Sequence, residues 1–312
     1  MTGAWPTFVV GGTVRAGTSS LYRFLSMRRD IGMSPQKEPH FFSHSGRDLS
    51  RHGPYEDPSD MVIEPQAYRA LFRQAASKPV RGECSASYLY HADRGAPLMR
   101  QLVPDLRAAF VLRDPVARAY SHYRLQRLYG WEPVDTFEEA LRLEDSRIAA
   151  GWLFPFHYRS MGFYSRQVRH TLVALPANQL LFLRFEEMVR DWQTIGPRLL
   201  SFIGASAEPP LEPLPHENDS GIPRRFELSR AVFGRGRARR LAHRLIPSQW
   251  LRSKVGRAIV RANRDPTPRI PPSTAAMLAE AYYSDVIRLS EMIEINVQPW
   301  FEAWNREAGE HA

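Results

Sequence analysis

The first two thirds of the chain alternate between short apolar runs and longer segments in which apolar residues recur at helical spacing. Four short apolar runs predict buried strands over residues 7–11, 80–83, 107–112 and 179–185. The helical patterns predict helices over residues 19–28, 66–76, 96–103, 115–129, 136–149, 162–175 and 194–203. Because strands and helices take turns along the chain, we expect a parallel sheet covered by helices on both faces.

The pattern changes in the last third of the chain. After a proline-rich stretch at residues 208–215, only helical patterns follow, over residues 229–245, 248–262 and 273–293. Earlier, residues 35–42 and 46–65 are predicted to form loops, the second one long and exposed. We therefore expect an α/β, P-loop-type three-layer fold in residues 1–207, with a central parallel sheet flanked by helices. A basic helical subdomain in residues 208–312 is expected to pack on it.

The positive charge of the chain is concentrated in one late segment. The 312 residues carry a formal net charge of +9, but residues 224–269 alone hold 14 Lys and Arg against Glu227 and Asp265. Such a segment is most often a solvated helical face. Its other uses are contact with a polyanion, a nucleotide phosphate or an anionic membrane surface. We expect no nucleic-acid partner, and peripheral membrane contact through residues 224–269 stays open.

Composition excludes several classes of protein. Cys84 is the only cysteine, so no disulfide can form within the chain. The ten histidines show no spacing typical of a structural zinc site, and we expect no metal. No apolar run approaches the roughly 20 residues that span a bilayer. Residues 1–6 lack the features of a secretory signal, so we expect a cytoplasmic protein.

The first strand leads into a turn with the pattern of a phosphate-binding loop. Backbone N–H groups of such a turn, together with the positive end of the following helix, bind anions. Gly12 and Gly17 have the spacing of a nucleoside triphosphatase loop, but Thr18 stands where the lysine of that motif would be. The cation lies inside the loop instead, at Arg15. The loop therefore favours a phosphate-bearing ligand other than MgATP.

Three further motifs carry polar groups at predicted strand ends and in loops. Arg113 ends the strand at 107–112, and Ser121 lies two helical turns later, so the pair could bind one phosphate. The alternative is an ion pair between Arg113 and Asp114, with Ser121 exposed. Residues 36–42 place Lys37, Glu38 and His40 close together, and residues 82–88 place two hydroxyls and an aromatic ring at another strand end. Each of these two motifs is weak alone.

In this order and spacing, the four motifs resemble the sulfotransferases that use 3′-phosphoadenosine 5′-phosphosulfate (PAPS), in their bacterial and heparan-sulfate-type branches. The resemblance covers roughly residues 5–205. The matching positions are Arg15, Gly17, Thr18, Ser19, Leu21, Lys37, Glu38, His40, Phe41, Phe42, Gly82, Glu83, Ser85, Tyr88, Arg113, Asp114, Pro115, Arg118, Ser121 and Tyr123.

The resemblance implies a role for each motif. The loop would surround the 5′-phosphosulfate through Gly12, Thr13, Val14, Arg15, Ala16, Gly17, Thr18 and Ser19. Arg113 and Ser121 would bind the 3′-phosphate. Glu38 would be the general base with His40 beside it, and Lys37 and Arg15 would be cations near the leaving group. Arg264 is the candidate for a late basic loop that closes over the nucleotide.

The implied reaction moves a sulfuryl group from PAPS to a hydroxyl, or less favourably an amine, leaving the product nucleotide PAP and requiring no metal. The expected acceptor is a carbohydrate, a glycolipid or another small metabolite. Some heparan-type enzymes carry lysine where Cys84 stands, so the acceptor does not follow from the resemblance. Two alternatives are a P-loop nucleotide or small-molecule kinase and a non-enzymatic module that binds polyanions or membranes. The sequence does not give the oligomeric state.

Overall fold

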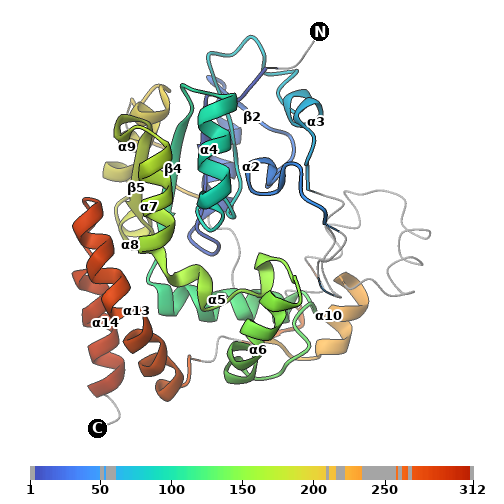
Figure 1. Ribbon diagram of the computed structural model, residues 1–312, viewed down its shortest axis with the longest axis vertical. Coiled ribbons are helices and arrows are strands. Elements are labelled where there is room, and N and C mark those ends of the chain that lie inside the picture. Colours follow the sequence, from blue (N-terminus) through green and yellow to red (C-terminus); the bar gives the residue numbers. More distant parts are fainter. Residues whose placement is uncertain are drawn as a thin grey trace.

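A five-stranded parallel sheet forms the centre of the molecule (Figure 1). The computed structural model describes residues 4–49, 53, 61–208, 211–215, 222–233, 258, 262–265 and 269–309. In spatial order the strands are β2 (Ile31–Met33), β3 (Val80–Cys84), β1 (Phe8–Val10), β4 (Arg107–Leu112) and β5 (Leu180–Arg184). The four predicted strands are confirmed, and so is the predicted fold class. The short edge strand β2 was not predicted.

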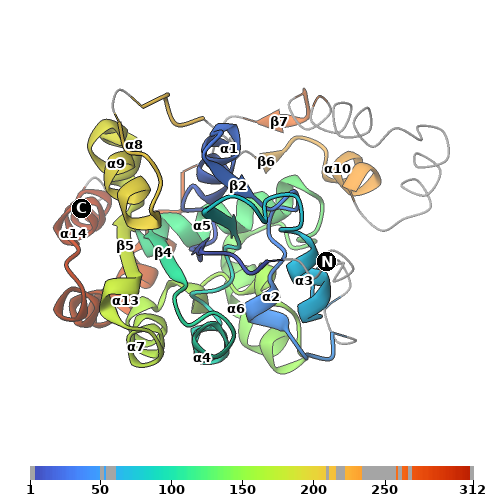
Figure 2. The ribbon, with the colours of Figure 1, turned by 90° about the horizontal axis from the view of Figure 1, so that it is seen from above.

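Helices cover both faces of the sheet, as Figure 2 shows. On one face lie α1 (Thr18–Met27) and α9 (Trp192–Ile203), and on the other α4 (Ala92–Leu102) and α7 (Tyr164–Ala174). Successive side chains of a strand point to opposite faces. In β4, Phe110 accordingly joins the core beneath α4 and α7, while Val111 joins the core beneath α1 and α9.

The helix α5 (Pro115–Leu128) begins directly after β4 and lies across the end of the sheet (Figure 1). Its first turn is set by Pro115, which has the backbone angle a helix start requires. The Asp114 side chain caps it, with Oδ1 accepting the Val116 N–H at 2.8 Å and the Ala117 N–H at 3.2 Å. The polar residues that follow β4 are thus fixed at the start of α5.

Shorter elements and one further helix complete the α/β part. They are α2 (Phe41–His44), α3 (Pro65–Ala70), α6 (Phe137–Ala149), η2 (Phe154–Phe156), η3 (Ser160–Gly162), η4 (Ala177–Gln179) and α8 (Phe185–Arg190). The predicted loop at 35–42 is wrong at its end, where α2 begins. The helix predicted over 66–76 ends at Ala70 and continues as turns.

Among its described residues, the last third of the chain contains helices and a small strand pair. The helices described there are α10 (Phe226–Phe233), α13 (Pro272–Met292) and α14 (Gln298–Gly309). Residues of α13 and α14, among them Tyr282 and Trp300, belong to the same core as α4 and α7. The division at residue 207 stays a prediction.

The expectation of helices alone beyond residue 215 is wrong. Strands β6 (Ile222–Pro223) and β7 (Arg264–Asp265) pair in antiparallel fashion. Two-residue strands leave no periodic pattern, and this pair is held by Asn263, whose side chain exchanges hydrogen bonds with the Arg225 backbone at 2.9 Å. Most of the basic segment 224–269, including the helix predicted over 248–262, lies outside the described residues. Within the described part of the chain, no helix is both long and apolar enough to cross a membrane.

Candidate active site

The loop between β1 and α1 is shaped by close packing against neighbouring elements. Gly12 (φ 139°) and Gly17 (φ 83°) adopt backbone angles that favour glycine. A Cβ atom on Gly17 would lie 2.7 Å from Met188 Cε, the end of a flexible side chain, so it is the positive φ that favours glycine there. The Thr13 N–H donates to the Val111 carbonyl at 2.7 Å, which ties the loop to β4. The first backbone N–H groups of α1 therefore lie next to a cavity that is lined by Gly17, Thr18 and Ser19.

Two guanidinium groups converge on this loop. Arg15 Nε donates to Ser121 Oγ at 2.9 Å, and Arg113 Nη1 donates to the Arg15 carbonyl at 2.8 Å. The Arg113 guanidinium also lies over the Phe185 ring, 4.7 Å from its centroid. Burial, followed by the nearby Arg113 charge, lowers the pKa of Arg15 to about 10. Because two like charges are held together here, the site favours a bound anion.

Lys37, Glu38 and His40 form a second charged group. Lys37 Nζ pairs with Glu38 Oε1, and His40 Nε2 lies 3.5 Å from Glu38 Oε2. Burial alone would raise the pKa of Glu38, but the Lys37 ammonium and the hydrogen bond and charge of His40 outweigh it. The net result is a Glu38 pKa well below its usual range. Glu38 is therefore a carboxylate at neutral pH and can accept a proton.

The backbone of this segment is held in an unusual conformation by the end of β3. Glu38 and His40 both have φ of 57°, a region that costs non-glycine residues energy. The Glu38 N–H donates to the Cys84 carbonyl, and the His40 N–H donates to Ser85 Oγ, each at 3.0 Å. The His40 ring is fixed from the other side, because its Nδ1 lies 2.7 Å from Ser87 Oγ.

Behind Ser85 lies a buried carboxyl group, Glu83. It accepts hydrogen bonds from Ser85 Oγ at 2.8 Å, Tyr88 Oη at 2.5 Å and Tyr68 Oη at 3.1 Å. Burial raises the pKa of Glu83 to about 7, although these hydrogen bonds act to lower it. The motif at residues 82–88 thus supports the segment that holds Glu38 and His40. Its sequence alone did not show this connection.

One cavity of about 1190 Å³ joins the two charged groups. The predicted site residues that line it are Val14, Arg15, Gly17, Thr18, Ser19, Lys37, Glu38, His40 and Arg113. Gly12, Thr13 and Ala16 are buried beside it, and the buried Ser121 meets the site through Arg15. Arg264 lies in β7, and its side chain falls outside the described residues. In the described part of the chain, no group of His, Cys, Asp or Glu is arranged to hold a metal ion.

Helix α14 contacts the base of the Arg113 segment. Trp304 Nε1 donates to both oxygens of Asp114, at 3.1 and 3.2 Å, so Asp114 is engaged by α5 and α14. Glu186 accepts the Asp114 N–H at 3.0 Å through one oxygen and the Trp300 Nε1–H at 3.2 Å through the other. Asp114 is thus occupied as a cap and as an acceptor. The sequence could not show this bracing, because the two tryptophans lie more than 110 residues from their partners.

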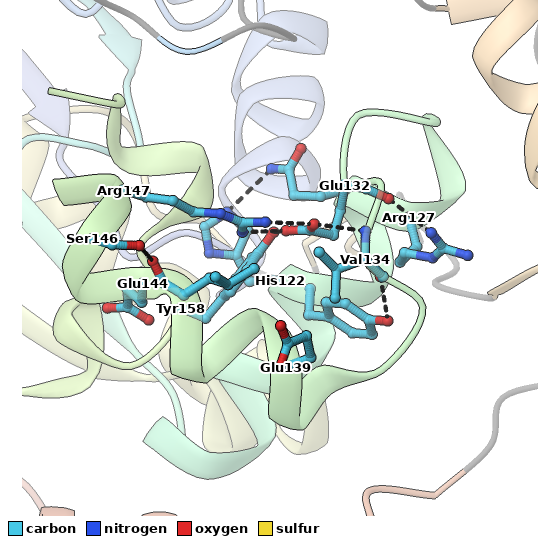
Figure 3. A network of polar contacts seen from close by, with 12 residues as sticks. His122, Arg127, Glu132, Val134, Glu139, Glu144, Ser146, Arg147 and Tyr158 are labelled. Atoms are coloured by element: carbon cyan, nitrogen blue, oxygen red, sulfur yellow. Dashed lines mark hydrogen bonds and ion pairs between the residues drawn. The ribbon is translucent and has the colours of Figure 1, made fainter. Parts of the chain in front are cut away.

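A buried polar network lies behind the part of the cavity that α5 lines (Figure 3). Glu132, fully buried, accepts two hydrogen bonds from Arg147, at 2.6 and 2.9 Å, and one from Tyr158 Oη at 2.8 Å. On α5, His122 lies between Arg118 and Gln126, with ring nitrogens 3.5 and 3.2 Å from their side-chain nitrogens. Of these residues, His122 and Gln126 line the cavity.

The sequence of this chain is similar to those of known sulfotransferases. The family model described as "Sulfotransferase domain" matches residues 6–216. The chain is 29% identical over 238 residues to human bifunctional heparan sulfate N-deacetylase/N-sulfotransferase 3, covering 69% of this chain and 23% of that protein. It is 27% identical over 201 residues to human heparan sulfate glucosamine 3-O-sulfotransferase 3B1, covering 64% of this chain and 46% of that protein. The chain thus spans between about a quarter and a half of the length of these curated relatives.

A solved structure is similar over nearly the whole chain. The sulfotransferase from Alicyclobacillus acidocaldarius superposes with a TM-score of 0.72 and 25% sequence identity, covering 95% of this chain and 99% of that one. This similarity covers more of the chain than the 6–216 match does.

Proposed function

This chain belongs to the sulfotransferase family, and we propose that it transfers the sulfuryl group of PAPS to an acceptor hydroxyl. The observation that supports the proposal is that two charged groups line the same cavity. One is the loop after β1 with the guanidinium groups of Arg15 and Arg113, and the other is the Glu38 carboxylate, which is paired with a lysine and a histidine.

The residues around the loop fit a doubly phosphorylated nucleotide. The loop from Gly12 to Ser19, with the first amides of α1, would hold the 5′-phosphosulfate. Arg113 and Ser121 would hold the 3′-phosphate, with Arg15 lying between the two groups. A bound dianion would relieve the repulsion between Arg15 and Arg113. Thr18, at the start of α1, offers a hydroxyl where a kinase loop has lysine.

The second group supplies the proton transfer. Glu38 accepts the proton of the acceptor hydroxyl while the hydroxyl oxygen forms a bond to sulfur. The bond between sulfur and the bridging oxygen of the 5′-phosphate breaks, and PAP leaves. Lys37 and Arg15 neutralise the charge that grows on the bridging oxygen. His40 holds the second oxygen of Glu38 and is the other candidate base. The acceptor would be a carbohydrate, a glycolipid or a small metabolite.

The test replaces Glu38 by Gln and measures PAPS turnover together with PAP affinity. We expect turnover to fall about 10²–10⁴-fold, the usual contribution of a general base, with PAP affinity nearly unchanged. Glu64→Gln is the matched control, because Glu64 is exposed at the start of α3. Full activity in Glu38→Gln would remove Glu38 from the mechanism and leave His40 as the base.

A further inference from the structure

We propose that Ser87 is a positioning residue of the transfer reaction: its hydroxyl donates to Nδ1 of His40 and so keeps the Nε2–H of that ring on Glu38. The inference rests on the sulfotransferase function proposed above. It is drawn from a line of polar side chains that begins at Glu38 in the cavity and ends at Ser43 in α2.

The partners of the His40 ring decide which of its nitrogens carries the hydrogen. Nε2 lies 3.5 Å from Glu38 Oε2, and Glu38 is a carboxylate at neutral pH, which only accepts hydrogen bonds. Nε2 therefore carries the hydrogen. In the neutral ring Nδ1 is then an acceptor, and Ser87 Oγ, 2.7 Å away, is its donor.

The same hydroxyl decides which way round the ring lies. A half-turn about the Cβ–Cγ bond would exchange Nδ1 with Cδ2 and Nε2 with Cε1, so C–H groups would face both oxygen partners. The Phe154 ring lies 5.2 Å from the His40 ring and has no hydrogen-bonding group that would resist this turn. The hydrogen bond from Ser87 therefore stabilises the orientation in which Nε2 faces Glu38.

Ser87 is itself held by two helices. Its side chain is fully buried, and its Oγ lies 2.8 Å from Ser43 Oγ in α2. Its carbonyl accepts the His91 N–H at 3.1 Å, directly before α4. Since the Ser87 hydrogen goes to the His40 ring, Ser43 is the donor between the two serines.

This line of side chains positions the His40 ring and does not carry the proton of the acceptor away. Within the described residues it ends at Ser43, which is fully buried, so a proton passed along it would not reach water. Glu38 lines the cavity and can release the proton there.

The consequence for the reaction is a fixed carboxylate. His40 holds one oxygen of Glu38 and Lys37 holds the other, so the base keeps one orientation toward the acceptor hydroxyl. Ser87 does not line the cavity itself. Its loss should therefore slow the chemical step and leave nucleotide binding unchanged.

The experiment replaces Ser87 by Ala and reads both the ring and the reaction. The ¹⁵N spectrum of histidine-labelled protein at pH 8, with the His40 signals assigned by their absence from His40→Asn, reports the hydrogen on each ring nitrogen. We expect the wild type to carry it on Nε2, and the Nδ1 signal to move in Ser87→Ala. PAPS turnover, in the assay that tests Glu38→Gln, should fall about 2–10-fold, the value of one hydrogen bond, with KM for PAPS and PAP affinity unchanged.

Two further variants separate positioning from a general effect on folding. Ser165→Ala removes another buried hydroxyl, which donates to Asp285 Oδ1 at 2.5 Å in the contact between α7 and α13. It should leave both the His40 signals and turnover at wild-type values. Ser87→Cys keeps the size of the side chain but offers a weaker donor. Its turnover should lie between those of the wild type and Ser87→Ala.

The outcomes distinguish this inference from the proposed function. A hydrogen on Nδ1 of His40 in the wild type would overturn the inference, as would an unmoved Nδ1 signal or full turnover in folded Ser87→Ala. Should Ser87→Ala fail to fold, full turnover in Ser87→Cys would do the same. Each of these results leaves the sulfotransferase function standing. Failure of the wild type to bind PAP would overturn the proposed function, and the inference with it.

Discussion

Arg113 shows how much a single residue of this site depends on its surroundings. Arg113 directly follows the buried strand β4. Its guanidinium lies over the Phe185 ring and donates to the Arg15 carbonyl, so three separate elements fix its position. Strand-end position and spacing allowed a phosphate-binding role for Arg113, and the resemblance to the sulfotransferases implied one. The stacking and the contact with the loop arise from tertiary packing that no local pattern encodes.

Replacing Arg113 by Ala tests whether Arg113 binds the 3′-phosphate of the nucleotide. A hydrogen bond to a charged group is worth about 1.5–3 kcal/mol, so PAP affinity should fall about 10–100-fold. Affinity for adenosine 5′-phosphosulfate, which lacks the 3′-phosphate, should fall much less. Arg73→Ala, at an exposed position after α3, is the control. Equal losses for both nucleotides would show that Arg113 does not distinguish them.

Glu83 gives a prediction about stability and pH. Its pKa is raised to about 7 in the folded protein, so the folded state binds its proton more tightly than the unfolded chain does. The stability that this tighter proton binding gives to the folded state is fully present below about pH 4.5 and is lost as the pH rises through 7. The difference between a pKa of about 7 and the ordinary value of 4.5 corresponds to a loss of up to about 3 kcal/mol in the free energy of unfolding.

Glu83→Gln removes this titration. We expect its free energy of unfolding to change less between pH 5 and pH 8 than that of the wild type, measured by denaturant titration at each pH. The control Glu64→Gln should follow the wild-type curve. Parallel curves for Glu83→Gln and the wild type would contradict the raised pKa.

At the scale of elements, the central strands and most of the longer helices were predicted, whereas helix α14 and the short strands β2, β6 and β7 were not. Strand β4 matches its predicted range, and α5, α6, α7 and α13 agree within two residues or so at each end. Helices α6, α7 and α13 each bury one apolar face, which leaves a periodic pattern. Helix α5 is buried almost all round, and its start is marked by Pro115 instead. Strands β2, β6 and β7 have two or three residues, too few for any period. Helix α8 follows β5 with no turn residue between them, so the strand predicted over 179–185 included Phe185, the first residue of the helix.

Helix α14 was also missed, and it carries a prediction of its own. Trp304→Phe keeps an aromatic ring, although a smaller one, and removes the N–H that binds Asp114, at a cost of about 1–3 kcal/mol in unfolding free energy. Because Asp114 adjoins Arg113, PAP affinity should also fall, by about threefold or more. Trp152→Phe, where the ring packs on Phe156 and lies next to Arg147, controls for the loss of an indole. Unchanged PAP affinity in Trp304→Phe would show that α14 does not support the site.

At the scale of the whole molecule, the site forms where segments far apart in the sequence meet at one end of the sheet. The loop after β1, the segment before α2, the end of β4 and the residues around Phe154 all reach the same cavity. Parallel strand order makes such a meeting predictable, because ligands of open α/β sheets bind at the carboxyl ends of the strands. The rest of the cavity lining was not predictable. Met61 and Trp131 lie outside regular elements, and Phe154 begins the three-residue helix η2, so their positions depend on the complete fold.

The central claim is that this cavity binds a nucleotide carrying phosphates at both its 3′ and 5′ positions. Calorimetric titration of the full chain with PAP, beside ADP at the same concentrations, tests it most directly. We expect one site for PAP, with an affinity at least about tenfold higher than for ADP. Absence of heat with PAP, or equal affinity for the two nucleotides, would contradict it.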